Sequence, residues 1–114
     1  MTREFIITQE FDKNWKNMGL SDGDLKVLQE ELTLNPQKGD VIQGTGGLRK
    51  IRISFDNKGK SGSGRVCYVD FVVHEKIYLI TAYPKKEKEN LTKSERNAIA
   101  KMIEKIEAEL KGKG

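Results

Sequence analysis

The sequence has too few cysteines and histidines to build the common catalytic and metal-binding sites. Its only cysteine is Cys67, which excludes an intramolecular disulfide and a cysteine-based metal site. Its only histidine is His74, and no serine or cysteine stands at a motif spacing that would make it part of a hydrolase triad. The acidic residues are scattered, without the paired carboxylates of glycosidases or two-metal enzymes. We therefore expect a protein that uses neither a metal nor another cofactor.

Long apolar segments are also missing. No stretch approaches the roughly 18 apolar residues of a membrane span, and the N-terminus, Met1 to Glu4, lacks the anatomy of a signal peptide. These absences predict a cytoplasmic protein with no membrane partner. A length of 114 residues is typical of one domain, so we expect a single domain covering residues 1–114.

The glycine-rich segment does not match a nucleotide-binding loop. Gly44-Thr45-Gly46-Gly47 precedes a predicted strand, whereas phosphate-binding loops precede a helix. We expect these glycines to shape a turn. Cys67 lies among valines in a predicted strand and is expected to be a buried, inert thiol. His74, at a strand end, is expected at the surface.

Two helices are predicted in the first third of the chain, after a short strand at residues 5–8. The first helix has Phe11, Trp15 and Met18 at helical spacing and ends at Gly19. The second begins at Ser21, with Asp24 three positions later as in a capping box. Leu25, Leu28 and Leu32 form its apolar stripe, and Asn35-Pro36 ends it.

Three strands and a last helix are predicted in the rest of the chain. Residues 48–54 alternate between charged and apolar side chains, and further strands are predicted at 65–74 and 77–83. Thr92 and Glu95 fit a capping box that opens a helix with Ile99, Met102, Ile103, Ile106 and Leu110 on one face. The order β-α-α-β-β-β-α predicts an α+β fold, with a helix pair and a C-terminal helix packed on a small antiparallel sheet.

Positive charge is concentrated in the middle of the chain. Residues 38–91 carry 11 Lys/Arg against 6 Asp/Glu, and the whole chain has a formal charge of +4. Between Arg49 and Arg65 there are six basic residues and one acidic residue, Asp56. A basic segment of this kind favours a phosphate-backbone partner, although an ordinary solvated face would also account for it.

The strand pattern places several of these cations together. Alternation puts Lys50 and Arg52 on one face, roughly 7 Å apart, and puts Ile51 and Ile53 on the other. That separation suits neighbouring phosphates of single-stranded RNA. Arg65 begins the next strand. Further cations are predicted in the intervening loop, Lys58 and Lys60, and after the last strand, Lys85 and Lys86.

The sequence resembles the HigB branch of the RelE toxins. The segment that carries the resemblance is Asn35-Pro36-x-x-Gly39-Asp40-Val41-Ile42-x-Gly44-Thr45-Gly46-Gly47-Leu48-Arg49-Lys50-Ile51-Arg52. The strand containing Arg65, the Tyr-Pro-Lys-Lys-Glu segment from Tyr83 to Glu87 and the terminal helix follow in the order of that family. The resemblance covers nearly the whole chain, and it implies a RelE-like fold.

The resemblance also implies a function. Such toxins belong to type II toxin–antitoxin pairs, enter the A site of the ribosome beside 16S rRNA, and cleave mRNA there without a metal. The implied partners are mRNA, the ribosome and a HigA-like antitoxin. The catalytic residues carried over are Arg65, Lys50 and Lys86, and the implied RNA-binding residues are Arg49, Arg52, Lys58, Lys60, Tyr83 and Lys85.

One departure from the family pattern concerns proton transfer. Many RelE proteins have a tyrosine shortly after the last basic residue, where this chain has Asn90-Leu91-Thr92. Arg65 is the expected phosphate clamp, because a guanidinium donates in a planar fork and stays charged. Lys50 or Lys86 can act as the base only if neighbouring cations lower a lysine pKa from about 10.4. The proton acceptor is left open.

Two other functions are compatible with parts of this pattern. The ParE toxins, which inhibit gyrase without acting as enzymes, resemble the chain in architecture but generally lack the basic set of Lys50, Arg52, Arg65 and Lys86. A non-catalytic RNA- or ribosome-binding module would also use a basic sheet surface.

Overall fold

The computed structural model describes residues 2–54 and 62–112. The elements are strand β1 (Glu4–Ile7), helices α1 (Gln9–Asn17) and α2 (Asp22–Leu34), strands β2 (Asp40–Val41), β3 (Arg49–Ser54), β4 (Ser63–Phe71) and β5 (Lys76–Pro84), and helix α3 (Lys93–Gly112). A short 3-10 helix, Val72–His74, joins β4 to β5. Within the described ranges, no helix has the length and apolar composition needed to span a membrane.

The five strands form one sheet in the order β1-β5-β4-β3-β2. Strands β2 to β5 are antiparallel, as predicted, but β1 pairs with β5 in parallel, so the sheet is mixed. The parallel pairing arises because the chain leaves β1 through two helices and re-enters the sheet at its opposite edge. The α+β prediction is confirmed, while the two-residue strand β2 was not predicted.

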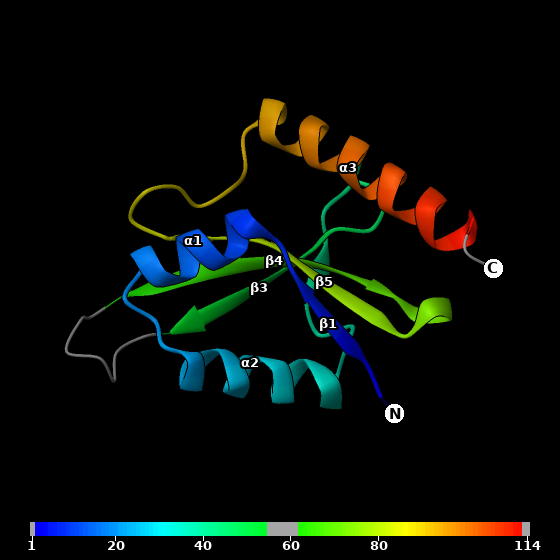
Figure 1. The fold of residues 1–114 in the computed structure, drawn as a ribbon. Helices are drawn as coiled ribbons and strands as arrows, with labels where there is room; N and C mark the ends of the chain where they lie inside the picture. The colour runs from blue at the N-terminus through cyan, green and yellow to red at the C-terminus, as the bar shows by residue number, and fades with distance from the viewer. Residues whose placement is uncertain (1, 55–61, 113–114) are drawn as a thin grey trace.

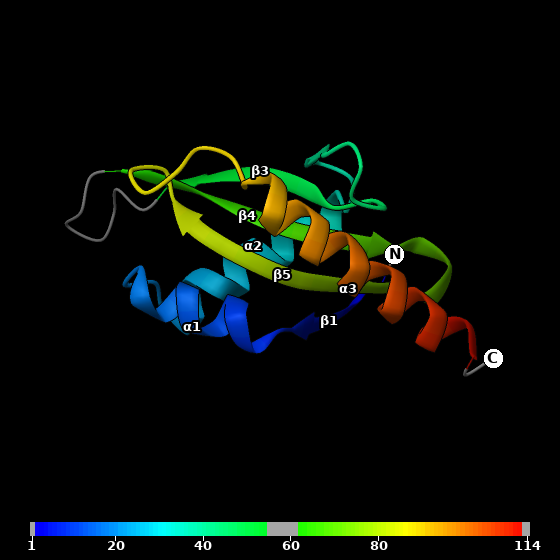
Figure 2. The ribbon, with the colours of Figure 1, turned by 90° about the horizontal axis from the view of Figure 1, so that it is seen from above.

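Helices cover both faces of the sheet. Helix α3 lies across one face and α2 across the other, while α1 packs beside β5 (Figures 1 and 2). The core under α1 and α2 is formed by Phe11, Trp15, Leu28, Leu32, Ile51, Val66, Tyr68 and Leu79. The core under α3 is formed by Leu48, Cys67, Val69, Ile80, Tyr83, Leu91, Ile99 and Ile103.

The helix starts follow their capping residues. The Ser21 hydroxyl accepts from the Asp24 N–H, and the Asp24 carboxylate accepts from the Ser21 N–H, so the predicted capping box is present. Thr92 and Glu95 make the same reciprocal pair at the start of α3. The prediction that Met102 lies on the buried face of α3 is wrong. Its side chain is 39% exposed, because the buried stripe follows Ile99 and Ile103.

The glycine-rich segment forms a turn, as predicted. Gly44, Gly46 and Gly47 all have positive φ values, which residues with a Cβ rarely adopt. The buried Thr45 hydroxyl donates to the Ile42 carbonyl and accepts from the Leu48 N–H. This turn leads the chain directly into β3, the strand that carries Lys50 and Arg52.

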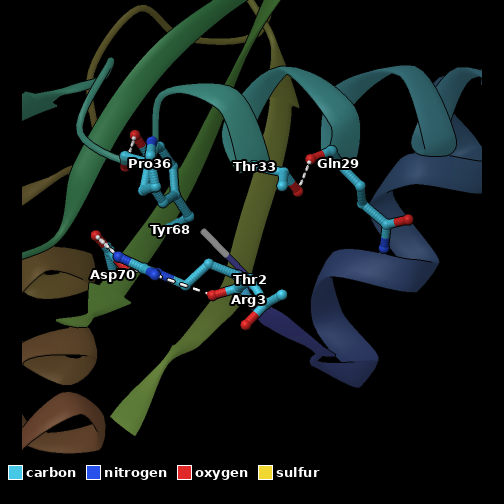
Figure 3. Close-up of polar contacts among 7 residues, drawn as sticks. All are labelled: Thr2, Arg3, Gln29, Thr33, Pro36, Tyr68 and Asp70. Atoms are coloured by element: carbon cyan, nitrogen blue, oxygen red, sulfur yellow. Dashed lines mark hydrogen bonds and ion pairs between the residues drawn. The ribbon is translucent and has the colours of Figure 1, made fainter. Parts of the chain in front are cut away.

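Two sets of polar contacts connect β4 to other parts of the chain. Arg3 Nε donates to Asp70 Oδ1 at 2.8 Å (Figure 3), and the side chains are 3% and 1% exposed. Nearby, the buried Tyr68 hydroxyl donates to the Pro36 carbonyl at 2.8 Å and accepts from the Gly39 N–H at 2.9 Å. These contacts join segments far apart in the sequence.

Candidate RNA-binding and catalytic site

A cleft of about 410 Å³ opens where β3 and β4 approach the loop between β5 and α3. Three of its side chains are cations and two are carboxylates. It is lined by Asp40, Lys50, Ile51, Arg52, Arg65, Glu89 and Asn90. We call it the cationic cleft.

The pairing of β3 with β4 brings the cations together. Arg52 lies directly opposite Arg65, and Lys50 lies opposite Cys67. Directly opposed residues on antiparallel strands share a face of the sheet, with Cβ atoms about 4.5–5.5 Å apart. Ile51 points to the opposite face and is buried in the core under α1 and α2. The alternation predicted for this strand is therefore confirmed as a spatial arrangement.

Arg65 is the most enclosed of the cleft cations. Its side chain is 6% exposed. The guanidinium donates from Nη1 to the Gly64 carbonyl at 3.1 Å and from Nη2 to Glu89 Oε1 at 3.4 Å. The Glu89 side chain is 60% exposed. A buried positive charge thus faces a cleft while its carboxylate partner sits largely in water.

Lys50 is held from the same loop. Its ammonium donates from Nζ to Asn90 Oδ1 at 2.7 Å. The amide oxygen is a neutral acceptor, so this bond fixes the position of the ammonium without neutralising its charge. Two adjacent loop residues, Glu89 and Asn90, therefore contact two different cations of the cationic cleft.

Cys67 and Tyr83 neighbour the cations on the same face of the sheet, opposite Lys50 and Arg65 respectively. Burial raises the pKa of the Cys67 thiol to about 11, even though Tyr83 and Lys50 act in the opposite direction. The prediction that this thiol is buried is confirmed. Burial also raises the pKa of Tyr83. Within the described residues its hydroxyl has no conventional hydrogen-bond partner, and the neighbouring thiol is a weak one.

Tyr83 is not placed as an open stacking surface. It is buried against the core under α3, and the Lys88 ammonium lies 5.2 Å from the centre of its ring. Lys88 is itself paired with Glu95. Direct contact between this ring and an RNA base would require Lys88 to move aside.

Lys86 lies outside the cationic cleft. It lines a second hollow, of about 750 Å³, between α1, the end of β5 and the start of α3, together with Lys13, Asn14 and Glu87. Lys85 is exposed beside it, and its N–H donates to the Ser63 carbonyl. The structure thus brings together Lys50, Arg52 and Arg65, and separates Lys86 from them.

The remaining candidates lie elsewhere. Arg49 donates to the carbonyls of Gln37 and Gly39, and so braces the segment before β2. Lys58 and Lys60 fall outside the described residues. His74 lies beside a third hollow near the β4–β5 connection, together with Asp70 and Val73. In residues 2–54 and 62–112, no group of three or more His, Cys, Asp or Glu side chains is arranged to hold a metal.

Sequence reasoning did not identify Asp40, Glu89 or Asn90 as cleft residues. Asp40 comes from the short strand β2, where it pairs with Lys50. Glu89 and Asn90 come from a connector that has no periodic pattern. Two signals pointed to this connector: acidic residues interrupt the basic run after Lys85-Lys86, and Asn90 stands near the position of the family's tyrosine.

The geometry suits the binding and polarisation of a phosphodiester. A guanidinium has five N–H donors in a planar fork and remains charged, so Arg65 can hold two oxygens of one phosphate. Lys50 and Arg52 add positive charge on the same face. In a partly enclosed cleft, such donors stabilise the charge that builds up on a phosphate during displacement.

Comparisons with known proteins agree with this arrangement. Residues 3–113 match the family model described as the RelE toxin of the RelE/RelB toxin–antitoxin system. The fold is also similar to that of a solved structure, a double arginine-to-alanine mutant of the E. coli toxin RelE in the free state. That similarity has a TM-score of 0.57 and 17% sequence identity over 78% of this chain and 90% of the other. The chain therefore belongs to the RelE toxin family.

Proposed function

We propose that this toxin is a ribosome-dependent mRNA interferase of the HigB type, which cleaves translated mRNA in the ribosomal A site. The observation that carries the proposal is the enclosed Arg65, flanked by Lys50 and Arg52 in one cleft. Membership of the RelE family supports it. The matching antitoxin is expected to be HigA-like and to cover this cleft or to block entry into the ribosome.

The proposed chemistry is intramolecular transesterification. The 2′-oxygen of the RNA attacks the adjacent phosphorus, the bond from phosphorus to the 5′-oxygen breaks, and the products are a 2′,3′-cyclic phosphate and a 5′-hydroxyl. Arg65 clamps the non-bridging oxygens, and Lys50 stabilises the charge that develops during displacement. The ribosome supplies the alignment of the message, which accounts for a large part of the barrier in such reactions.

Other cations are assigned to RNA contacts around the cleft. Arg52 lies beside Arg65 and is exposed, so it can reach a neighbouring phosphate. Lys85 and Lys86 lie at the start of the loop between β5 and α3, outside the cleft, where they can contact RNA that continues past the scissile position. A contribution of Lys86 to the chemical step requires the loop to bring it closer to Arg65.

The test is the substitution Arg65→Ala. We expect the purified variant to remain folded and to lose mRNA cleavage by at least about 100-fold, the effect of removing one strong transition-state donor. Cleavage is measured by primer extension on mRNA in a translation reaction. Lys101→Ala, an exposed cation on α3 away from the cleft, is the matched control.

Three outcomes contradict the proposal. An Arg65→Ala variant that cuts at the wild-type rate rules out the phosphate clamp. A wild-type protein that causes gyrase-linked DNA damage without cutting mRNA is a ParE-like toxin. A wild-type protein that binds ribosomes and does neither is a binding module.

A further inference from the structure

The cationic cleft contains few groups that can accept a proton. Arg52 and Arg65 are permanent cations, and the amide of Asn90 is not a base. A lysine is ordinarily protonated at neutral pH, so Lys50 must lose its own proton before it can take another. Carboxylates are ordinarily ionised there. The cleft has two of these, Asp40 and Glu89.

The positions of the two carboxylates differ with respect to Arg65. Glu89 Oε1 lies 3.4 Å from Nη2 of the Arg65 guanidinium. Asp40 is on β2, which is separated from β4 by β3. Two strand spacings amount to roughly 9–10 Å. A phosphate clamped by Arg65 therefore lies next to Glu89 and well away from Asp40.

Arg65 can hold a phosphate without releasing Glu89. Its contacts with Gly64 and Glu89 engage Nη1 and Nη2, whereas the guanidinium has five N–H donors. A phosphate oxygen bound to the remaining donors shares one rigid cation with the carboxylate. This geometry places the carboxylate beside the ribose attached to the clamped phosphate.

The loop that carries Glu89 is anchored yet open to an incoming strand. Asn90 accepts from Lys50 at 2.7 Å, and the Glu87 N–H donates to the Pro84 carbonyl at 3.1 Å. These bonds fix the chain on both sides of Glu89. Its side chain is nevertheless largely exposed, so a ribose hydroxyl can reach it from solvent.

We propose that Glu89 is the general base of this toxin, the group that takes the proton from the attacking 2′-hydroxyl. The inference rests on the proposed RNA cleavage. As the bond from the 2′-oxygen to phosphorus forms, the 2′-proton passes to the Glu89 carboxylate. As the bond from phosphorus to the 5′-oxygen breaks, the leaving oxygen takes a proton from the Lys50 ammonium. Solvent then returns both residues to their starting states, and no oxidant, metal or further reactant is required.

Glu89 also has a simpler possible role, as a counter-ion that shields Arg65 until RNA arrives. The two roles predict opposite results for Glu89→Gln. Loss of a counter-ion strengthens RNA binding and leaves cleavage intact or faster, because the cleft becomes more positive. Loss of a base slows the chemical step and leaves binding unchanged or tighter.

The experiment is single-turnover cleavage of mRNA on programmed ribosomes at neutral pH, measured together with ribosome binding for the wild type and four variants. Glu89→Gln removes the proposed base while keeping the size and hydrogen bonding of the side chain. Asp40→Asn removes the other carboxylate of the cleft. Glu87→Gln removes a charge from the same loop but outside the cleft.

We expect Glu89→Gln to lower the cleavage rate by about 100-fold, with ribosome binding no weaker than wild type. Glu89→Asp should recover part of the loss, because it restores a carboxylate one methylene shorter. Glu87→Gln should match the wild type, and Asp40→Asn should lower cleavage far less than Glu89→Gln, because Asp40 lies two strands away from the strand that carries Arg65.

A Glu89→Gln variant that cuts within threefold of the wild-type rate, or faster, overturns the assignment. So does a variant that loses cleavage only in proportion to a loss of ribosome binding. These results are distinct from failure of the proposed function, in which the wild type itself does not cut mRNA.

Discussion

Arg3 and Arg65 both have enclosed side chains, but their acidic partners differ in exposure. The Arg3 side chain is 3% exposed and pairs at 2.8 Å with Asp70, whose side chain is 1% exposed. Arg65 is 6% exposed but pairs at 3.4 Å with Glu89, most of whose side chain is in water. At the first site both charges are withdrawn from solvent and satisfy one another. At the second site, the fold holds the guanidinium of Arg65 in place, while the exposed Glu89 carboxylate is free to move.

This difference separates a structural ion pair from a binding site. A carboxylate that is itself enclosed cannot leave its arginine without exposing two unpaired charges. A solvated carboxylate can shift at little cost, because water takes over its hydrogen bonds. An incoming phosphate can therefore share Arg65 but cannot displace Asp70 from Arg3. The exposure of the acidic partner distinguishes the two roles.

The largest expected effect on stability is at the first site. Arg3→Ala leaves the Asp70 charge enclosed and unpaired, and we expect the free energy of unfolding to fall by about 3 kcal/mol, the low end for a buried pair because this one lies near the surface. Arg65→Ala should cost roughly 1 kcal/mol, since Glu89 stays solvated. Urea denaturation measures both. Equal losses in the two variants would remove the basis of the comparison.

A smaller loss of stability is expected from a neutral hydrogen bond near the Arg3–Asp70 pair. Tyr68→Phe removes a buried neutral hydroxyl that donates to the Pro36 carbonyl and accepts from the Gly39 N–H. We expect the free energy of unfolding to fall by about 1–3 kcal/mol, because both backbone groups lose their partner. Tyr78→Phe, on the neighbouring strand β5, is the control and should change stability by less than about 0.5 kcal/mol. If Tyr68→Phe left the free energy of unfolding unchanged, the Arg3–Asp70 ion pair alone would stabilise this end of the fold.

Local patterns predicted much of the fold and placed Lys50 and Arg52 on one face of the strand that lines the cationic cleft. The alternation along residues 48–54 correctly separated Lys50 and Arg52 from Ile51, since a strand sends successive side chains to opposite faces. The two capping boxes were also correct, because each depends on residues only three positions apart. Such features need no knowledge of the rest of the chain.

Features that depend on distant contacts were not predictable in the same way. The parallel pairing of β1 with β5 joins residues about 70 positions apart, and Arg3 meets Asp70 across 67 positions. Glu89 and Asn90 were missed because the connector before α3 has no periodicity to assign them to a face. Lys86 was grouped with Arg65 through the family resemblance, whereas in the fold it lines a hollow beside α1.

The smallest effect concerns an ion pair of intermediate exposure. Lys88 contacts Glu95 with both side chains about one-third exposed. The Lys88 contact and the Thr92 N–H hold the pKa of Glu95 below its ordinary value. Glu95→Gln keeps an acceptor for the Thr92 N–H and removes only the charge. We expect the free energy of unfolding at neutral pH to fall by less than about 1 kcal/mol.

The pH dependence of Glu95→Gln tests whether the Glu95 charge stabilises the fold. Because the folded-state pKa of Glu95 is lowered, its contribution is complete above the ordinary glutamate pKa of about 4.3 and is lost as the pH falls through the lower, folded-state value. The stability difference between wild type and Glu95→Gln should therefore close on acidification, whereas Glu104→Gln, an exposed change on the same helix, should show a smaller difference throughout. A difference that persists at the lowest pH would assign the effect to hydrogen bonding. The exposure of a carboxylate partner would then be a weaker guide to the strength of an ion pair than the two arginine sites indicate.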